Sequence, residues 1–96
     1  MAMVTLRYWA AAKEAAGIAE EAVSAGTLAE ALAAASDDGG PGGADQQRGE
    51  RNARLRAILV RSSFLVDGTP VGTRAPEAVM LGEGSVVEVL PPFAGG

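Results

Sequence analysis

The sequence predicts one α+β domain, in which a mixed sheet packs on one main helix. Three observations favour this class. Both ends of the chain carry strongly apolar strand patterns, one well-capped helical pattern lies between them, and 96 residues suffice for one small two-layer domain. Because 20 of the apolar residues are alanines, few large side chains are left to build the core.

Three short elements are predicted in the first quarter of the chain. Residues 3–9 (MVTLRYW) alternate apolar and polar side chains, which is typical of a half-buried strand. The alanine-rich residues 10–16 favour a short helix with Gly17 as its C-cap. Residues 18–24 carry acidic side chains beside Val23, which indicates a weaker strand at an edge of the sheet.

The clearest helix begins at Thr27. Residues 27–30 (TLAE) have the form of a capping box, in which the Thr27 hydroxyl and the Glu30 carboxylate each accept a backbone N–H. Apolar side chains then recur at helical spacing and form one stripe: Leu28, Ala31, Leu32 and Ala35.

A glycine-rich segment and a second helix follow. Residues 36–50 contain five glycines, one proline and almost no apolar side chain, so we expect a mobile surface loop. Residues 51–61 place Leu55, Ile58 and Leu59 at helical spacing among four arginines. This pattern indicates an amphipathic helix with a solvated basic face, and an anion-binding patch is the alternative.

Two turns and three strands complete the pattern. Residues 64–71 (FLVDGTPV) predict a strand, a tight Asp-Gly turn and a short return strand. Residues 82–85 predict a second turn, and the β-branched residues 86–90 predict a central strand. If the first and last strands pair in the centre of the sheet, they are parallel and the chain between them crosses over the helix. That arrangement is the ubiquitin-like β-grasp, which we assign to residues 1–90, followed by an extended tail of residues 91–96.

The residue types that are missing exclude several chemistries. Without cysteine or histidine, the chain has no thiolate metal site, no thiol nucleophile and no imidazole base. A net charge of −4 disfavours binding to a nucleic-acid backbone. No apolar stretch is long enough to span a membrane, and no signal peptide opens the chain. We therefore expect a cytoplasmic protein without a bound cofactor or metal, and without a nucleic-acid or membrane partner.

The last eight residues (VLPPFAGG) carry no charged side chain and suit insertion into a partner. Pro91 and Pro92 favour an extended, pre-ordered spacer, and Phe93 can bury its ring in a groove. Gly95 and Gly96 lack a Cβ, so the backbone there can thread a narrow channel.

The tail also suits chemistry at its own carboxyl carbon. A free carboxylate is a poor acyl donor, because its charge repels nucleophiles and oxide is a poor leaving group. Activation of Gly96 as an acyl-adenylate removes both obstacles, and a sulfur nucleophile can then displace AMP to leave a thiocarboxylate. A flexible chain end without a function is the alternative.

Four segments resemble the MoaD/ThiS family of ubiquitin-like sulfur carriers, and within it the small subunits of molybdopterin synthase. They are VTLRYWAAAKEAAG (4–17), TLAEAL (27–32), FLVDGTPV (64–71) and LGEGSVVEVLPPFAGG (81–96), with PPFAGG as the specific part. Two departures stand out. The loop at 36–50 is longer and richer in glycine than the family pattern, and Ser85 follows Gly84 where members commonly carry aspartate. We expect the serine to change a turn hydrogen bond and not the chemistry.

The resemblance implies a sulfur carrier in molybdenum cofactor biosynthesis. An ATP-dependent adenylyltransferase of the ubiquitin-activating type would adenylate Gly96, and a sulfur donor protein would supply the sulfur. The tail would then enter the large subunit of molybdopterin synthase, in a heterotetramer. That large subunit would hold the catalytic side chains, so the chain itself would be a non-catalytic sulfur donor, and only the activating enzyme would use ATP.

The resemblance also implies roles for particular residues. Gly95 and Gly96 would be the functional dipeptide, and four residues would lie along the insertion channel: Pro91, Pro92, Phe93 and Ala94. Phe64 and Leu65 are further candidates for the apolar partner interface, with a place in the core as the alternative.

Four other functions fit the same pattern. A sulfur carrier for thiamine biosynthesis or for cysteine biosynthesis would share the fold and the glycine end, and would differ in the partner that reads the tail. A ubiquitin-like modifier would be joined to lysines through Gly96. A β-grasp binding module with an inert end is the remaining alternative.

Overall fold

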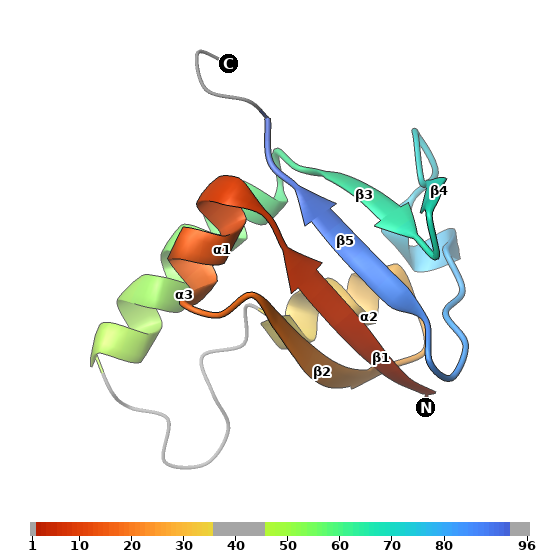
Figure 1. Cartoon of the computed structure of the whole chain (residues 1–96), viewed down its shortest axis with the longest axis horizontal. Coiled ribbons are helices and arrows are strands. Elements are labelled where there is room, and N and C mark those ends of the chain that lie inside the picture. Colours follow the sequence, from red (N-terminus) through yellow and green to blue (C-terminus); the bar gives the residue numbers. More distant parts are fainter. Residues whose placement is uncertain (1, 36–45, 93–96) are drawn as a thin grey trace.

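The computed structural model describes residues 2–35 and 46–92, with residues 46–52 described by their backbone alone. Two segments lie outside this description. One is residues 36–45, which belong to the predicted loop, and the other is the end of the tail: Phe93, Ala94, Gly95 and Gly96. The elements follow the predicted order (Figure 1): β1 (Ala2–Tyr8), α1 (Ala10–Ala16), β2 (Glu20–Ala25), α2 (Leu28–Ala35), α3 (Gln46–Leu59), β3 (Ser63–Val66), β4 (Thr69–Pro70), the 3₁₀ helix η1 (Pro76–Ala78) and β5 (Val86–Leu90).

The five strands form one mixed sheet in the order β2-β1-β5-β3-β4. The first and last strands pair in parallel, from Thr5 opposite Val86 to Tyr8 opposite Val89, which confirms the predicted central pair. Strand β2 lies at an edge, as predicted, and pairs with β1 antiparallel. The chain between β1 and β5 carries α2, which covers one face of the sheet (Figure 1).

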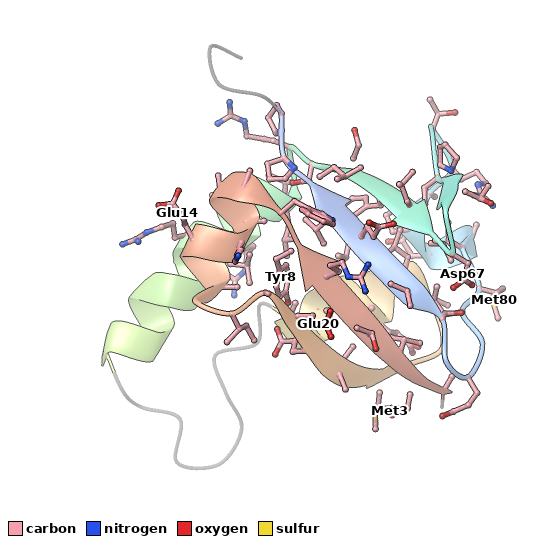
Figure 2. The ribbon with its side chains drawn as sticks, in the orientation of Figure 1. Met3, Tyr8, Glu14, Glu20, Asp67 and Met80 are labelled. Carbon is pink, nitrogen blue, oxygen red and sulfur yellow. The ribbon has the colours of Figure 1, made fainter. Side chains whose placement is uncertain are left out.

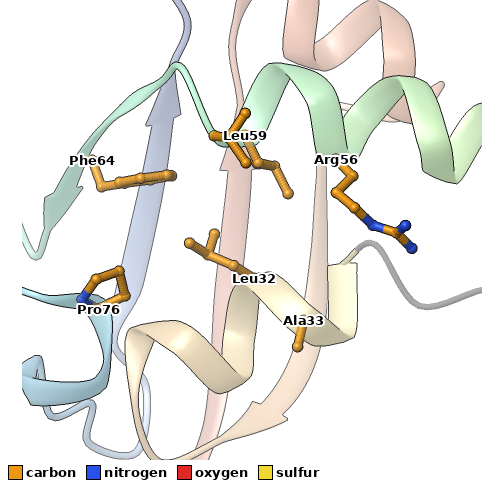
Figure 3. Close-up of a pocket in the computed structure, with 7 residues that line it drawn as sticks. Leu32, Ala33, Arg56, Leu59, Phe64 and Pro76 are labelled. Atoms are coloured by element: carbon orange, nitrogen blue, oxygen red, sulfur yellow. The ribbon is translucent and has the colours of Figure 1, made fainter.

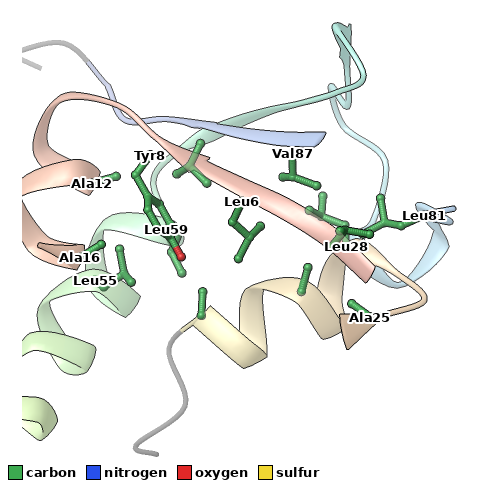
Figure 4. Packing of buried hydrophobic residues seen from close by; sticks show 14 of the residues in the cluster. Leu6, Tyr8, Ala12, Ala16, Ala25, Leu28, Leu55, Leu59, Leu81 and Val87 are labelled. Atoms are coloured by element: carbon green, nitrogen blue, oxygen red, sulfur yellow. The ribbon is translucent and has the colours of Figure 1, made fainter. Parts of the chain in front are cut away.

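The core lies between the sheet and the three helices. Alternate residues of the central strands point into it, and Leu6, Val87 and Val89 are completely buried. Leu55 of α3 packs near Ala12 and Ala16 of α1, where the small side chains let the two helices approach (Figure 4). The helical stripe of α2 is confirmed for its buried members, while Leu32 stays partly exposed at the rim of the core.

One polar contact explains an acidic residue on the inward side of β2. Tyr8 is buried, and its hydroxyl donates a hydrogen bond to the Glu21 carboxylate. A buried tyrosine needs a partner for its hydroxyl, and the neighbouring edge strand supplies it.

The predicted caps are present at α1 and α2. Gly17 has φ +79° and its N–H donates to the carbonyl of Lys13 over 2.9 Å, which ends α1 in a left-handed cap. At α2, the Glu30 N–H donates to Thr27 Oγ1 over 3.2 Å, and the Thr27 N–H donates to Glu30 Oε1 over 3.1 Å. This reciprocal pair is the capping box expected from the sequence.

The start of α3 corrects the predicted loop. The helix begins at Gln46, so residues 46–50 are helical and not part of a loop that extends to residue 50. Glutamine, arginine and glutamate are good helix formers, and grouping them with the glycines before them hid this preference. Gly49 lies inside the helix, where it costs about 1 kcal/mol relative to alanine.

The two predicted turns are joined by hydrogen bonds. Asp67 and Gly68 have φ of +50° and +85° and connect β3 to β4, as the Asp-Gly pattern predicts. The Asp67 carboxylate accepts the Val86 N–H over 2.9 Å and the Ser85 hydroxyl over 3.2 Å. Ser85 Oγ in turn accepts the Gly82 N–H over 3.1 Å. The hairpin is therefore fastened to the start of β5, on the side of the molecule where Figure 2 labels Asp67.

Thr27→Ala tests the capping box. Loss of the hydroxyl leaves the Glu30 N–H without its side-chain acceptor, so we expect the free energy of unfolding to fall by about 1 kcal/mol. Chemical unfolding followed by circular dichroism measures this change. The matched control is Thr73→Ala at an exposed position, for which we expect a change within about 0.5 kcal/mol. Equal effects of the two substitutions would contradict the capping role.

Candidate functional site at the base of the C-terminal tail

The tail leaves the sheet from the end of its central strand. Leu90, the last residue of β5, pairs with Ser63 at the start of β3. On the other side, the Trp9 N–H donates to the carbonyl of Val89 over 3.3 Å. The tail therefore starts between the end of β1 and the start of β3, held by backbone contacts on both sides (Figure 1).

The two prolines of the tail have different surroundings. Pro91 is buried, whereas Pro92 is exposed. The buried ring continues the inward alternation of Val87 and Val89, so Pro91 belongs to the base of the tail. The part of the tail that is open to a partner thus begins at Pro92. The roles predicted for Phe93, Ala94, Gly95 and Gly96 concern residues outside the described ranges and stay predictions.

The face of the sheet away from the helices lies beside this exit. Val86, Glu88 and Leu90 alternate with the buried residues of β5 and so point to this open face. The strand register places Arg7 on one side of Glu88 and Leu65 on the other. The open face next to the tail thus combines apolar side chains with a charged row.

Trp9 is a residue of this surface that the sequence reasoning did not select. Its side chain is 45% exposed, and its indole Nε1 donates to Glu88 Oε1 over 3.2 Å. Because Glu88 points to the open face, the indole lies there too, close to the strand that carries the tail. A signal was present in the sequence, since Trp9 stands out of phase with the inward series Val4, Leu6 and Tyr8.

The charged row of this face continues to the edge strand. Arg7 Nε lies 3.3 Å from Glu20 Oε2, and both side chains are about half exposed. An exposed pair of this kind contributes little to stability. Its consequence is the position of the arginine, which the pairing keeps on the open face beside Glu88.

Phe64 and Leu65, predicted together as a partner interface, point to opposite faces of the sheet. Phe64 pairs with the buried Val89, packs against the core and is only partly exposed. Leu65 pairs with Glu88 and points to the open face. Consecutive strand residues alternate between faces, so one flat partner surface cannot use both side chains. Leu65 belongs with the base of the tail, and Phe64 lies on the helix side.

The described residues show no side-chain cluster for metal chemistry. Among the side chains that the structure describes, those of residues 2–35 and 53–92, no group of three or more Asp, Glu, His or Cys could hold a metal ion. None of the helices in residues 2–35 and 46–92 is long and apolar enough to cross a membrane. The described part of the site consists of the base of the tail at Pro91 and Pro92 and the exposed Trp9 beside it.

Comparison with known proteins gives matches of structure and not of sequence. No family model matches the chain, and no curated protein matches it. Small archaeal modifier protein 1 from Methanosarcina acetivorans superposes with a TM-score of 0.76 at 19% identity, covering 100% of this chain and 98% of that chain. Subunit 1 of a molybdopterin converting factor from Pyrococcus furiosus gives a TM-score of 0.65 at 17% identity, covering 97% and 100%.

A complex of subunits 1 and 2 of molybdopterin-converting factor from Helicobacter pylori also matches. The TM-score is 0.61 at 21% identity, over 98% of this chain and 99% of that chain. At such identities the shared property is the fold. The chain has the ubiquitin-like β-grasp fold.

The β-grasp topology accounts for the geometry of the site. In this fold the last strand lies in the middle of the sheet, with β1 on one side and β3 on the other. The base of the tail is consequently fixed by two neighbouring strands (Figure 1).

The two prolines give a matched test of where the fixed part of the tail ends. Pro91→Ala removes buried ring atoms, so we expect the free energy of unfolding to fall by about 1–2 kcal/mol. Pro92→Ala removes an exposed ring and should change it by at most about 0.5 kcal/mol. Urea unfolding of both variants measures the difference. A loss for Pro92→Ala as large as that for Pro91→Ala would show that the fixed part extends further.

Proposed function

We propose that the chain is the sulfur-carrier small subunit of a molybdopterin synthase and carries sulfur as a thiocarboxylate on Gly96. The observation that carries the proposal is the tail itself: the neutral sequence PPFAGG continues directly from the central strand of a β-grasp domain. The similarity to subunit 1 of molybdopterin converting factors supports this choice of pathway. The proposal requires a free carboxyl group on Gly96.

The chemistry needs no side chain of this domain. A carboxylate oxygen of Gly96 attacks the α-phosphorus of ATP, pyrophosphate leaves, and an acyl-adenylate results. Sulfur at the oxidation level of sulfide then attacks the carbonyl carbon, the bond to the AMP oxygen breaks, and AMP departs. The balance is one oxygen exchanged for one sulfur, with ATP converted to AMP and pyrophosphate. A separate adenylyltransferase and a sulfur donor protein supply the catalytic groups, and the absence of cysteine and histidine from the chain fits this division.

The surface around the tail is the proposed contact with a large subunit. Pro92, Phe93 and Ala94 extend from the buried Pro91 and enter the partner, with Gly95 and Gly96 at its reacting centre. Trp9, Leu65 and Leu90 on the open face form the apolar area around the point of entry. The Helicobacter pylori structure is a complex of two such subunits, which supports a partner of this kind. A cytoplasmic heterotetramer is part of the same proposal.

A second candidate is a ubiquitin-like protein modifier, joined to lysines through Gly96. The match to small archaeal modifier protein 1, over nearly the full length of both chains, specifically favours it. Both functions start from the same acyl-adenylate and diverge at the nucleophile, which is sulfur for a carrier and a lysine amine for a modifier. Intact-mass measurement separates them, because a carrier gains the difference between sulfur and oxygen and a modifier forms conjugates of much higher mass.

Altering the chain end tests sulfur loading. We expect deletion of Gly96, or addition of one alanine after it, to abolish loading while folding is unchanged, because the carboxyl carbon no longer lies at the required distance from the domain. Intact-mass analysis after incubation with ATP, a sulfur donor and the activating enzyme measures the product. The matched control adds one alanine before Met1 and should load normally. Loading of either altered tail would contradict the carrier function.

Phe93→Ala tests the aromatic anchor of the tail. If the ring fills a pocket of the large subunit, its loss should weaken binding by about 1–3 kcal/mol. Isothermal titration calorimetry with the large subunit measures the affinity. The control is Met80→Ala, which shortens a side chain that is 74% exposed and lies away from the base of the tail (Figure 2). Equal affinity of the Phe93 variant and the unmodified chain would exclude the ring as an anchor.

A further inference from the structure

A shallow groove lies on the helix side of the molecule, between α2, α3, β3 and η1. It has a volume of about 360 Å³. We call it the α2–α3 groove, and its lining residues are Leu32, Ala33, Arg56, Leu59, Val60, Phe64 and Pro76. Figure 3 shows Leu32 and Leu59 approaching each other from the two helices, with Phe64 and Pro76 beside them. Its floor is therefore made of apolar side chains.

The groove leaves large apolar side chains accessible. Val60 is 79% exposed, and Leu32 and Phe64 are only partly buried at the rim of the core. An apolar surface of this kind, bordered by polar groups, is typical of a site where another protein binds. Its size suits a few side chains of a partner and not a whole domain face.

The charged side chains among the described residues that line the groove and the depression beside it are arginines. Arg56 lines one end of the groove. The depression, of about 340 Å³, adjoins the groove through Phe64 and Pro76, and its lining includes Arg74. The Arg74 guanidinium is fixed there by donating to the carbonyls of Val71 and Pro70 over 3.1 and 3.2 Å. Among the described residues that line either depression, none is an aspartate or a glutamate.

This basic character contrasts with the rest of the protein. Six of the eight Lys and Arg residues lie in the segment 48–74, together with only two of the twelve Asp and Glu residues. That segment has a formal charge of +4 in a chain whose net charge is −4. Two of these six basic residues, Arg56 and Arg74, line the groove and the depression beside it.

We propose that the α2–α3 groove is a docking site for an acidic amphipathic segment of a partner protein. Apolar side chains of that segment would fill the space between Leu32, Leu59 and Phe64, and its carboxylates would lie near Arg56 and Arg74. Opposite charges along the rim speed association and select the partner, while burial of the apolar side chains supplies most of the affinity.

The site is separate from the one proposed for the tail. Phe64 faces the helix side, whereas Leu65, Trp9 and Leu90 belong to the open face. The sheet lies between the two surfaces, so an acidic segment could be bound while the tail is engaged elsewhere. A test of docking at the groove is therefore independent of a test of sulfur transfer.

A pair of peptides tests this docking site on the full chain. One capped peptide carries two large apolar residues a helical turn apart and glutamates at the other positions, and its twin carries lysines in place of the glutamates. We expect the acidic peptide to shift the amide signals of Leu32, Leu59 and Phe64 in a saturable titration by nuclear magnetic resonance. The lysine peptide should bind at least about tenfold more weakly, because the rim is basic.

Exposed positions allow variants that keep the fold. Arg56→Glu should weaken binding of the acidic peptide about tenfold and strengthen binding of its lysine twin. The control is Lys13→Glu on α1, at an exposed position outside the lining, which should change the affinity of neither peptide. Val60→Ser should weaken binding about fivefold. Its control is Met80→Ser, since Met80 is 74% exposed and outside the lining.

Four results would overturn the assignment. They are equal binding of the two peptides, shifts centred on the open face around Val86 and Leu90, no saturable shift, and equal effects of the variants and their controls. Signals of the groove that change on dilution without peptide would identify a second copy of the chain as its occupant. Signals that move in Phe93→Ala without peptide would identify the tail instead. Either outcome would replace the acidic partner.

Discussion

The parallel pairing of β1 with β5 is the contact on which the rest of the structure depends. It joins residues about eighty positions apart and places both strands in the middle of the sheet, where Leu6, Val87 and Val89 are fully buried. A parallel pair requires a crossover, and the intervening chain supplies it as helices that cover one face of the sheet. The opposite face stays open, and the end of β5 becomes the fixed base of the tail. A single pairing thus determines the core, the open face and the point where the tail emerges.

The hydrogen bonds of Asp67 support this pairing from the other end of β5. Its carboxylate accepts hydrogen bonds from the Val86 N–H and the Ser85 hydroxyl. These bonds connect the β3–β4 turn to the residue where β5 begins. The Ser85 hydroxyl accepts a hydrogen bond from the Gly82 N–H and donates one to the Asp67 carboxylate. An aspartate there would place a second carboxylate beside Asp67, which is unfavourable at short range. The change expected at this turn is therefore structural, and it lies at the end of β5 away from the tail.

Local signals in the sequence were enough for most of the fold. The Gly17 cap, the capping box at Thr27 and the Asp-Gly turn each depend on a few neighbouring residues, and all three are present. The predicted start of α3 was wrong, because the helix formers from Gln46 onward directly follow a glycine-rich stretch of the same polar segment. The site was harder to predict, since it depends on register. The Trp9 indole is positioned by its hydrogen bond to the Glu88 carboxylate, and the burial of Pro91 depends on packing around the end of β5.

The separation of Phe64 from Leu65 shows how register turns one apolar patch into two surfaces. In the sequence they are adjacent and equivalent, and the period-two rule already assigns them to opposite faces once β3 is recognised as a strand. What the rule does not give is the surroundings of each side chain. Leu65 lies across from Glu88 beside the tail, while Phe64 joins Leu32 and Leu59 at a basic groove. A small domain leaves some of its large apolar residues exposed on both faces, because its surface is large relative to its volume. The two exposed areas differ in charge, since the open face carries Arg7, Glu20 and Glu88 and the described lining of the groove carries Arg56. Under the two proposals, this difference would direct different partners to the two areas.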